Sequence, residues 1–123
     1  MKTYREIIAW KKSMKLVKNI YRLTDSLPKD EKFGLISQIR RAAVSIPSNI
    51  AEGFGRRSDK SFLNFLSIAV GSLYELKTQI EICYELSFIN KSNFKLINDD
   101  LEEVERLLIG FTSKIRRDPK NEQ

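Results

Sequence analysis

The chain contains no histidine and only one cysteine, Cys83, among its 123 residues. Without histidine, the commonest general base and metal ligand is missing, and a lone cysteine has no imidazole to activate it as a nucleophile. A single cysteine cannot form an internal disulfide, so we expect a reducing compartment, the cytoplasm. Because Cys83 falls on an apolar helical stripe, we interpret it as a small buried hydrophobe. We therefore expect no enzymatic activity and no cofactor.

Long hydrophobic runs are missing as well. No segment reaches the roughly 18 apolar residues that a membrane-spanning helix needs, and the first residues contain no apolar signal-peptide segment. We therefore predict no contact with a membrane. The length suits a single domain, residues 1–117, followed by a polar tail, residues 118–123, that we expect to fray.

Two local patterns could suggest chemistry, and neither is specific. Gly53-Phe54-Gly55 is too short for a phosphate-binding loop and lacks the lysine followed by serine or threonine that ends one. The acidic residues between positions 99 and 105 could be imagined as a metal site. They fall on the outer face of a predicted amphipathic helix, where solvated charge is the simpler interpretation, so we expect no metal.

Apolar residues recur at every third or fourth position in four segments, as they do in amphipathic helices. Three segments span about residues 7–24, 31–54 and 59–86, and a fourth helix follows a cap at Asn90 or Ser92 and runs through Ile115. Short turns join the segments, and no strand-like alternation competes with this interpretation. We therefore predict an all-α fold, an up-down-up-down antiparallel four-helix bundle.

The first predicted helix has a broad apolar half and a basic stripe. The apolar residues are Trp10, Met14, Val17, Ile20, Tyr21 and Leu23. On the opposite side, successive steps of four, three and four residues place four cations on one exposed face: Lys11, Lys15, Lys18 and Arg22. A solvated face that serves solubility is one interpretation of the stripe, and a surface that attracts a polyanion is the other.

Pro47 lies inside the second predicted helix, where a proline usually ends or bends a helix. The apolar residues keep helical spacing across it: Ile39, Ala43, Ile46, Ile50 and Phe54. We therefore predict one helix kinked at Pro47 rather than two separate helices. We expect this helix to end where Gly55 takes a left-handed conformation, and Ser58 and Asp59 to cap the next helix.

The third predicted helix carries two apolar strips. The main seam alternates steps of four and three: Phe62, Leu66, Ala69, Leu73, Leu76, Ile80 and Cys83. A second strip lies well round from the first: Leu63, Val70, Tyr74 and Tyr84. One strip is enough to join a monomeric bundle, so we expect a neighbouring subunit of a homo-oligomer to cover the second.

Polar residues flank the seams of the two central helices. They are Gln38, Arg41, Ser45, Asn49, Glu52 and Arg56 on the second helix, and Ser72, Glu75 and Gln79 on the third. If the helices turn back on each other near Arg57, Arg41 comes level with Glu75, Ser45 with Ser72, and Gln38 with Gln79. We interpret these residues as a structural hydrogen-bond network that fixes helix register or the subunit interface, and a ligand pocket is the alternative.

A resemblance to a known family rests on residues 38–53, QIRRAAVSIPSNIAEG, and on the positions that follow: Phe65, Ala69, Gly71, Ser72, Glu75 and Leu76. With Trp10 and the Leu27-Pro28 turn, this pattern resembles the bacterial four-helix-bundle family named after 23S rRNA intervening sequences, over nearly the whole chain except the tail. The resemblance implies a bundle that assembles as a ring, often a pentamer. It also implies kinship with the accessory variability proteins of diversity-generating retroelements, basic rings that bind nucleic acid.

The charge is unevenly distributed along the chain. Residues 1–60 carry a local charge of +8, residues 61–113 carry −4, and residues 114–123 return +2, for the overall +6. This asymmetry predicts positive potential on the first helix and at the turn with Arg56 and Arg57, where RNA or DNA would be attracted without base-specific stacking. We therefore predict a nucleic-acid-binding oligomer, which could also serve a nucleic-acid enzyme. The alternative is a protein-interaction scaffold whose charge is incidental.

Overall fold

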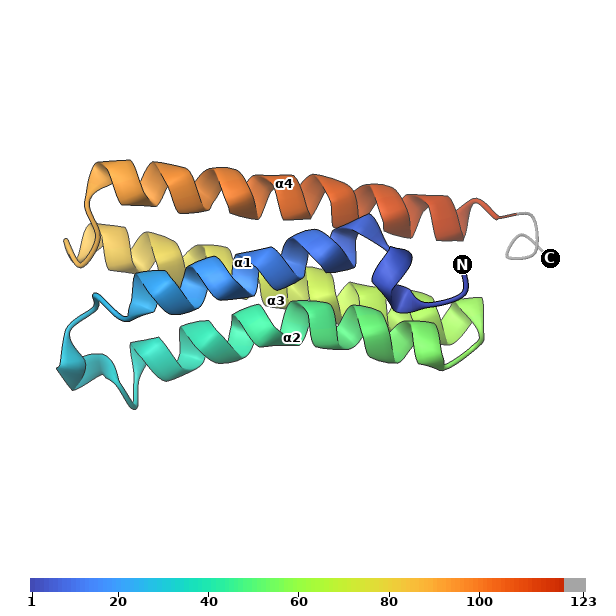
Figure 1. The fold of residues 1–123 in the computed structure, drawn as a ribbon, viewed down its shortest axis with the longest axis horizontal. Coiled ribbons are helices and arrows are strands. Elements are labelled where there is room, and N and C mark those ends of the chain that lie inside the picture. Colours follow the sequence, from blue (N-terminus) through green and yellow to red (C-terminus); the bar gives the residue numbers. More distant parts are fainter. Residues whose placement is uncertain (119–123) are drawn as a thin grey trace.

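Four long helices make up the fold (Figure 1). The computed structural model describes residues 1–118, which in chain order form η1 (Tyr4–Glu6), α1 (Ile8–Thr24), η2 (Lys29–Glu31), α2 (Leu35–Gly55), α3 (Asp59–Glu85) and α4 (Lys91–Arg116). No strand occurs among these residues, and the predicted all-α fold class is confirmed. The predicted polar tail, residues 118–123, lies outside the described residues apart from Asp118.

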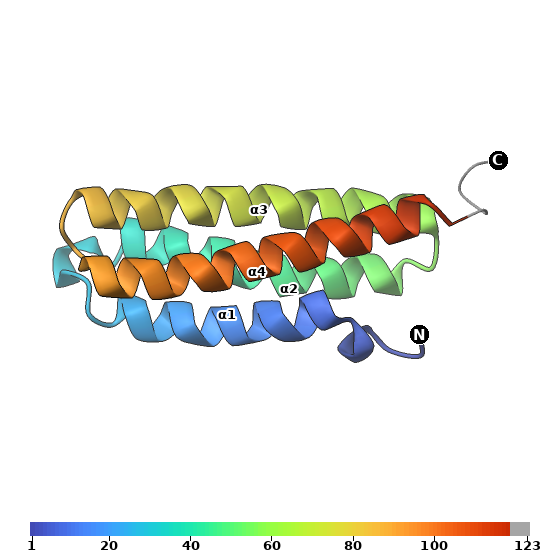
Figure 2. The same ribbon diagram turned by 90° about the horizontal axis from the view of Figure 1, so that it is seen from above.

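Each helix packs against two neighbours in the bundle. α1 and α3 each contact both α2 and α4. Consecutive helices run in opposite directions in both views (Figures 1 and 2). As a result, the amino terminus, the α2–α3 turn and the end of α4 lie at one end of the bundle, and the other two turns lie at the opposite end.

One hydrophobic core runs along the bundle, and it contains the predicted apolar positions of α2 and α3, apart from Phe54, which is partly buried against it. Ile46, Leu73 and Leu101, for example, are fully buried. Cys83 is also fully buried, and this burial, assisted by the charge of Glu31, raises the pKa of its thiol to about 11. The thiol therefore stays protonated at neutral pH, as expected of a buried hydrophobe.

The buried face of α1 differs from the one that the apolar pattern predicts. Its buried residues are Ala9, Ser13, Leu16, Ile20 and Thr24, whereas Met14 and Tyr21 are 45% and 40% exposed. Burial of the two hydroxyl residues is possible because each bonds its own helix: Ser13 Oγ donates to the Trp10 carbonyl, and Thr24 Oγ1 to the Ile20 carbonyl, both at 2.9 Å. A pattern built from apolar residues alone misses such positions.

α2 begins at Leu35, four residues later than predicted. Gly34 has a non-helical backbone (φ −110°, ψ −104°), and the Glu31 carboxylate accepts a hydrogen bond from the Leu35 amide at 3.2 Å. The residues before Gly34 form the short η2 helix and a turn instead. From Leu35 the helix continues without interruption across the buried Pro47, so the prediction of one helix is confirmed, while the kink stays a prediction.

The turn between α2 and α3 uses a different left-handed residue from the one expected. Gly55 is the last helical residue of α2, and Arg57 takes the positive backbone angle (φ 63°). Ser58 then caps α3 as predicted, because its side chain accepts a hydrogen bond from the Ser61 amide at 3.1 Å. The side chain of Asn90 caps α4 in the same way, through the Asn93 amide at 2.7 Å.

The second apolar strip of α3 faces α4 of the same chain. Tyr84 stacks on Phe94 with ring centroids 4.4 Å apart, and Val70 packs against the core. Tyr74 donates its hydroxyl proton to Glu105 Oε2 at 2.6 Å, although the residue stays 47% exposed. The expectation that a neighbouring subunit covers this strip is therefore wrong for Tyr84, because Phe94 of α4 already covers its ring, and it stays a prediction for the rest of the strip.

Glu105 joins α4 to α3 through two side chains. Besides Tyr74, it pairs with Lys77, whose Nζ lies 2.7 Å from Glu105 Oε1, and both side chains of the ion pair are less than a third exposed. The bond from Lys77 and then the bond from Tyr74 lower the pKa of Glu105, while the bond to Glu105 raises the pKa of Lys77. Charge-assisted bonds of this kind stabilise more than exposed ion pairs do.

Replacing Glu105 by glutamine is expected to lower the free energy of unfolding by about 1–2 kcal/mol at neutral pH. Because folding lowers the pKa of Glu105 from its ordinary value of 4.5, its contribution is complete above that value and is lost as the pH falls further. Denaturant unfolding over a pH series measures this. The exposed pair of Lys12 and Glu103 supplies the control, Glu103→Gln, which should cost less. If Glu105→Gln lowered the free energy of unfolding as much in acid as at neutral pH, the stabilisation could not come from the ionised Glu105 carboxylate.

Candidate nucleic-acid interface

Four cations lie along the outward face of α1. Lys11, Lys15, Lys18 and Arg22, hereafter the α1 stripe, are all exposed. At 100° per residue they fall opposite the buried Leu16 and Ile20, so they point away from the bundle axis. No carboxylate among residues 1–118 forms an ion pair with any of the four. The α1 stripe therefore presents to solvent four cations that no described carboxylate pairs with.

Acidic residues of α4 border the α1 stripe on one side only. Lys12 pairs with Glu103 at 3.3 Å, and Asn19 Nδ2 donates to Asp100 Oδ2 at 3.1 Å. These contacts tie α1 to α4 and keep two carboxylates at that edge. A polyanion that follows the α1 stripe would be repelled from the α4 edge, so the favourable approach is from the side of α2.

The two arginines predicted at the α2–α3 turn have different surroundings. Arg56 pairs with Glu52 at 3.2 Å, and its guanidinium lies 5.0 Å from the ring centre of Phe65. Arg57 is exposed and pairs with no carboxylate of the described chain. Arg57 is therefore the better placed of the two to meet a phosphate, since part of the Arg56 charge is already compensated by Glu52.

The fold gathers further cations at the end of the bundle that holds the α2–α3 turn (Figure 1). We call this set the basic end, and its cationic members are Lys2, Arg5, Arg56, Arg57, Lys60, Lys114, Arg116 and Arg117. Four carboxylates lie among them: Glu6, Glu52, Asp59 and Asp118. One hollow is lined by Lys2 near the amino terminus, by Arg57 and Asp59 at the α2–α3 turn, and by Asp118 after α4. These three segments of the chain therefore meet at this end of the bundle.

Sequence reasoning missed most of the basic end because its members come from three segments far apart in the chain. The signal was present in the predicted topology. In an antiparallel bundle of four helices, the amino terminus, the second turn and the carboxyl end meet at one end. The positive charge of the last helical turn therefore adds to that of Arg57 in space, although the two are separated by the whole of α3 and α4.

The polar residues between α2 and α3 form part of the predicted arrangement. Ser45 and Ser72 lie level, with their hydroxyl oxygens 2.8 Å apart. Asn49 Nδ2 donates to the Ser45 carbonyl at 2.7 Å and to the Ser45 hydroxyl at 2.9 Å. Gln79 Nε2 donates to Glu75 Oε1 at 3.2 Å, while Gln79 Oε1 is buried and has no hydrogen-bond partner among the described residues.

The pairing of Arg41 with Glu75 is wrong for the single chain. Both residues are exposed, and no ion pair or hydrogen bond joins them within residues 1–118. Gln38 is likewise exposed and does not bond Gln79, and Glu52 pairs along its own helix with Arg56. The spacing placed these side chains on the correct flank but not on the part of it that α3 covers.

Three further findings concern chemistry and membranes. Among residues 1–118, no three histidine, cysteine, aspartate or glutamate side chains are grouped so that they could hold a metal ion, and this includes the acidic run of α4. Within the same residues, no helix is both long enough and apolar enough to cross a membrane. The buried Cys83 thiol, with its raised pKa, is not a nucleophile at neutral pH.

Comparisons with known proteins agree with the fold. A family model described as 23S rRNA-intervening sequence protein matches residues 5–110. The crystal structure of a protein of unknown function from the S23 ribosomal protein family of Bacteroides thetaiotaomicron is similar, with a TM-score of 0.80 and 29% sequence identity. The similarity covers 86% of this chain and 96% of that one. No curated protein matches, and neither of these two descriptions names an enzymatic activity.

Proposed function

This chain belongs to the family of 23S rRNA-intervening sequence proteins, and on that premise we propose that it is a non-enzymatic, cytoplasmic homo-oligomer that binds RNA or DNA electrostatically. The observation that carries the proposal is the α1 stripe, in which four exposed cations pair with no described carboxylate. The stripe extends about 16 Å along α1 at 1.5 Å per residue, a length that meets several successive phosphates. In an oligomer every copy repeats the stripe, so weak phosphate contacts add up.

Binding by the wild-type protein is expected to weaken steeply with salt and to be nearly indifferent to base sequence. Each neutralised duplex phosphate contributes a slope of about −0.9 to log affinity against log salt, so four contacts predict about −3.6 per protein copy. Fluorescence anisotropy of labelled RNA and DNA at several salt concentrations measures this slope. A slope near zero, or no binding at low salt, would rule out the proposal.

A second candidate function is a protein-interaction scaffold, and one surface favours it. Along the face of α3 that carries Ser72, two large apolar side chains remain exposed, Ile68 (51%) and Ile82 (41%), and Leu86 (55%) follows directly after the helix. They share a helical face with Gln79, whose carbonyl lacks a partner among the described residues. We propose that copies of this chain meet there, as a pentamer if the family resemblance extends to subunit number. In the scaffold function, the oligomer assembled through this surface would present its remaining surfaces to a different protein, such as a nucleic-acid enzyme.

The α3 surface predicts how assembly should respond to mutation. Light scattering at micromolar concentration is expected to show a multimer, and Ile82→Asp to shift it toward the monomer, because a charge would be buried at the contact. Ile109→Asp is the matched control, since Ile109 on α4 is almost equally exposed, at 43%. A wild-type monomer, or equal behaviour of the two variants, would contradict assembly through this surface.

A further inference from the structure

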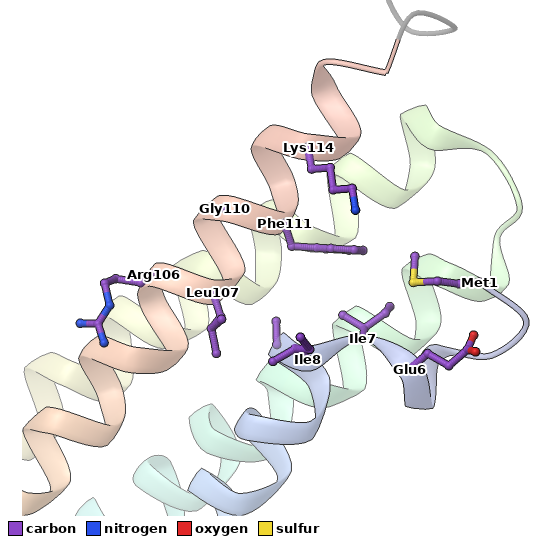
Figure 3. A pocket seen from close by; sticks show the side chains of 10 residues that line it. Met1, Glu6, Ile7, Ile8, Arg106, Leu107, Gly110, Phe111 and Lys114 are labelled. Carbon is purple, nitrogen blue, oxygen red and sulfur yellow. The ribbon is translucent and has the colours of Figure 1, made fainter.

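A cleft of about 460 Å³ opens between the start of α1 and the end of α4 (Figure 3). We call it the α1–α4 cleft. Most of its lining is apolar: Met1, Ile7, Ile8, Ala9, Leu107, Gly110 and Phe111. Figure 3 shows Leu107 pointing from α4 toward Ile8. The volume falls within the roughly 300–1,000 Å³ typical of small-molecule sites.

One lining position on α4, Gly110, has no side chain. A Cβ atom added to Gly110 would meet no other heavy atom within 4 Å. Two of the apolar lining residues are largely exposed to water, Ile8 at 59% and Met1 at 65%. Water-exposed apolar surface on two facing segments favours a flat apolar group that can fill the space between them.

The charges around the cleft select an anionic ligand. Arg106 and Lys114 line it, and neither pairs with a described carboxylate. The third charged residue, Glu6, is already engaged, because its Oε2 accepts hydrogen bonds from the Lys2 and Thr3 amides at 2.7 and 3.3 Å, and these bonds lower the pKa of Glu6. Lys114 also belongs to the basic end, so the cleft adjoins that group of cations.

We propose that the α1–α4 cleft receives one unpaired nucleotide of a bound nucleic acid. The base lies between Ile8 and the α4 residues Leu107 and Phe111, and its phosphate lies at Lys114, with the neighbouring phosphates on the basic end. This inference rests on the proposed nucleic-acid function and adds a preference to it. A base inside a duplex is stacked and paired and cannot enter the cleft, so single strands bind more tightly than duplexes of the same sequence.

Filling the cleft tests the inference. Gly110→Leu places an apolar side chain in the cleft and replaces glycine by a better helix former, so the fold is retained. Gly71→Leu is the matched control, because Gly71 also lies on an exposed helix surface, in α3, with open space at its Cβ position. Since Gly71 shares a helical face with Ile82, light scattering verifies that this variant assembles as wild type does. Anisotropy titrations measure the affinity of both variants for a labelled single strand and for its duplex. Gly110→Leu is expected to weaken single-strand binding about tenfold and to leave duplex binding unchanged.

The outcomes separate this inference from the proposed function. The inference is overturned if Gly110→Leu binds the single strand as tightly as Gly71→Leu does, if it weakens both probes equally, or if wild type shows no single-strand preference. In each of these cases a steep salt dependence of the wild type still supports electrostatic binding through the α1 stripe. Circular dichroism of the two leucine variants verifies that their helix content is equal.

Discussion

Replacing Lys11, Lys15 and Lys18 together by glutamate is expected to weaken nucleic-acid binding at least about 100-fold at physiological salt. Three phosphate contacts are lost, and three carboxylates then repel the polyanion from the same face. The three lysines are exposed and pair with no described carboxylate, so the bundle should unfold at nearly the same denaturant concentration as wild type. The remaining salt slope should be shallower by roughly one for each lysine removed.

A variant with the same change in net charge provides the control. Lys29, Lys32 and Lys91 are exposed and lie at the opposite end of the bundle from the basic end. Changing these three to glutamate alters the overall charge equally but leaves the α1 stripe intact, so binding should fall much less. If both triple variants bind alike, net charge alone explains the attraction, and the α1 stripe is only a solvated face. The scaffold function would then be favoured.

Replacing Gly53 by alanine is expected to cost about 2–3 kcal/mol of unfolding free energy, near the upper end of the range for overpacked cores. A Cβ at Gly53 would lie 2.7 Å from Phe65 Cβ and 2.9 Å from Phe62 Cδ1, distances that real Cβ contacts do not tolerate. α2 and α3 approach closely here because Gly53 has no side chain. One added methyl group therefore forces the helices apart or moves both phenylalanines.

Replacing Gly71 by alanine is expected to raise the free energy of unfolding instead of lowering it. Its Cβ position meets open space, so Gly71→Ala should stabilise α3 by about 0.5–1 kcal/mol, because alanine loses less backbone entropy on folding. Denaturant unfolding of both variants at one protein concentration measures the contrast, since stability depends on concentration if the protein assembles. Equal stabilities of Gly53→Ala and wild type would show that the two helices are not in close contact at this point.

The fold could be predicted wherever large apolar residues alone define a helix face. The seams of α2, α3 and α4 follow their spacing, and the core contains them. The face of α1 could not be predicted in this way, because the buried Ser13 and Thr24 hide their polarity in bonds to their own helix. The start of α2 depends on the non-helical backbone at Gly34 and on the Glu31 side chain, which helical periodicity does not reveal.

The candidate site also has one part that the sequence predicts and other parts that it does not. The α1 stripe lies on one helix, so a spacing of three and four residues is sufficient to find it. The basic end and the α1–α4 cleft each combine segments distant in sequence, which helical spacing alone does not bring together. The Arg41–Glu75 pairing failed because spacing gives the flank of a helix but not how far the neighbouring helix covers that flank.

Where the amino terminus lies affects how binding can be measured. Met1 lines both the α1–α4 cleft and the hollow at the basic end, so an affinity tag fused in front of it would start inside the surfaces being tested. A fluorophore is better attached at the far end, for example through Ser92→Cys near the start of α4. Maleimide would label that exposed thiol selectively, because the native Cys83 is buried and stays protonated.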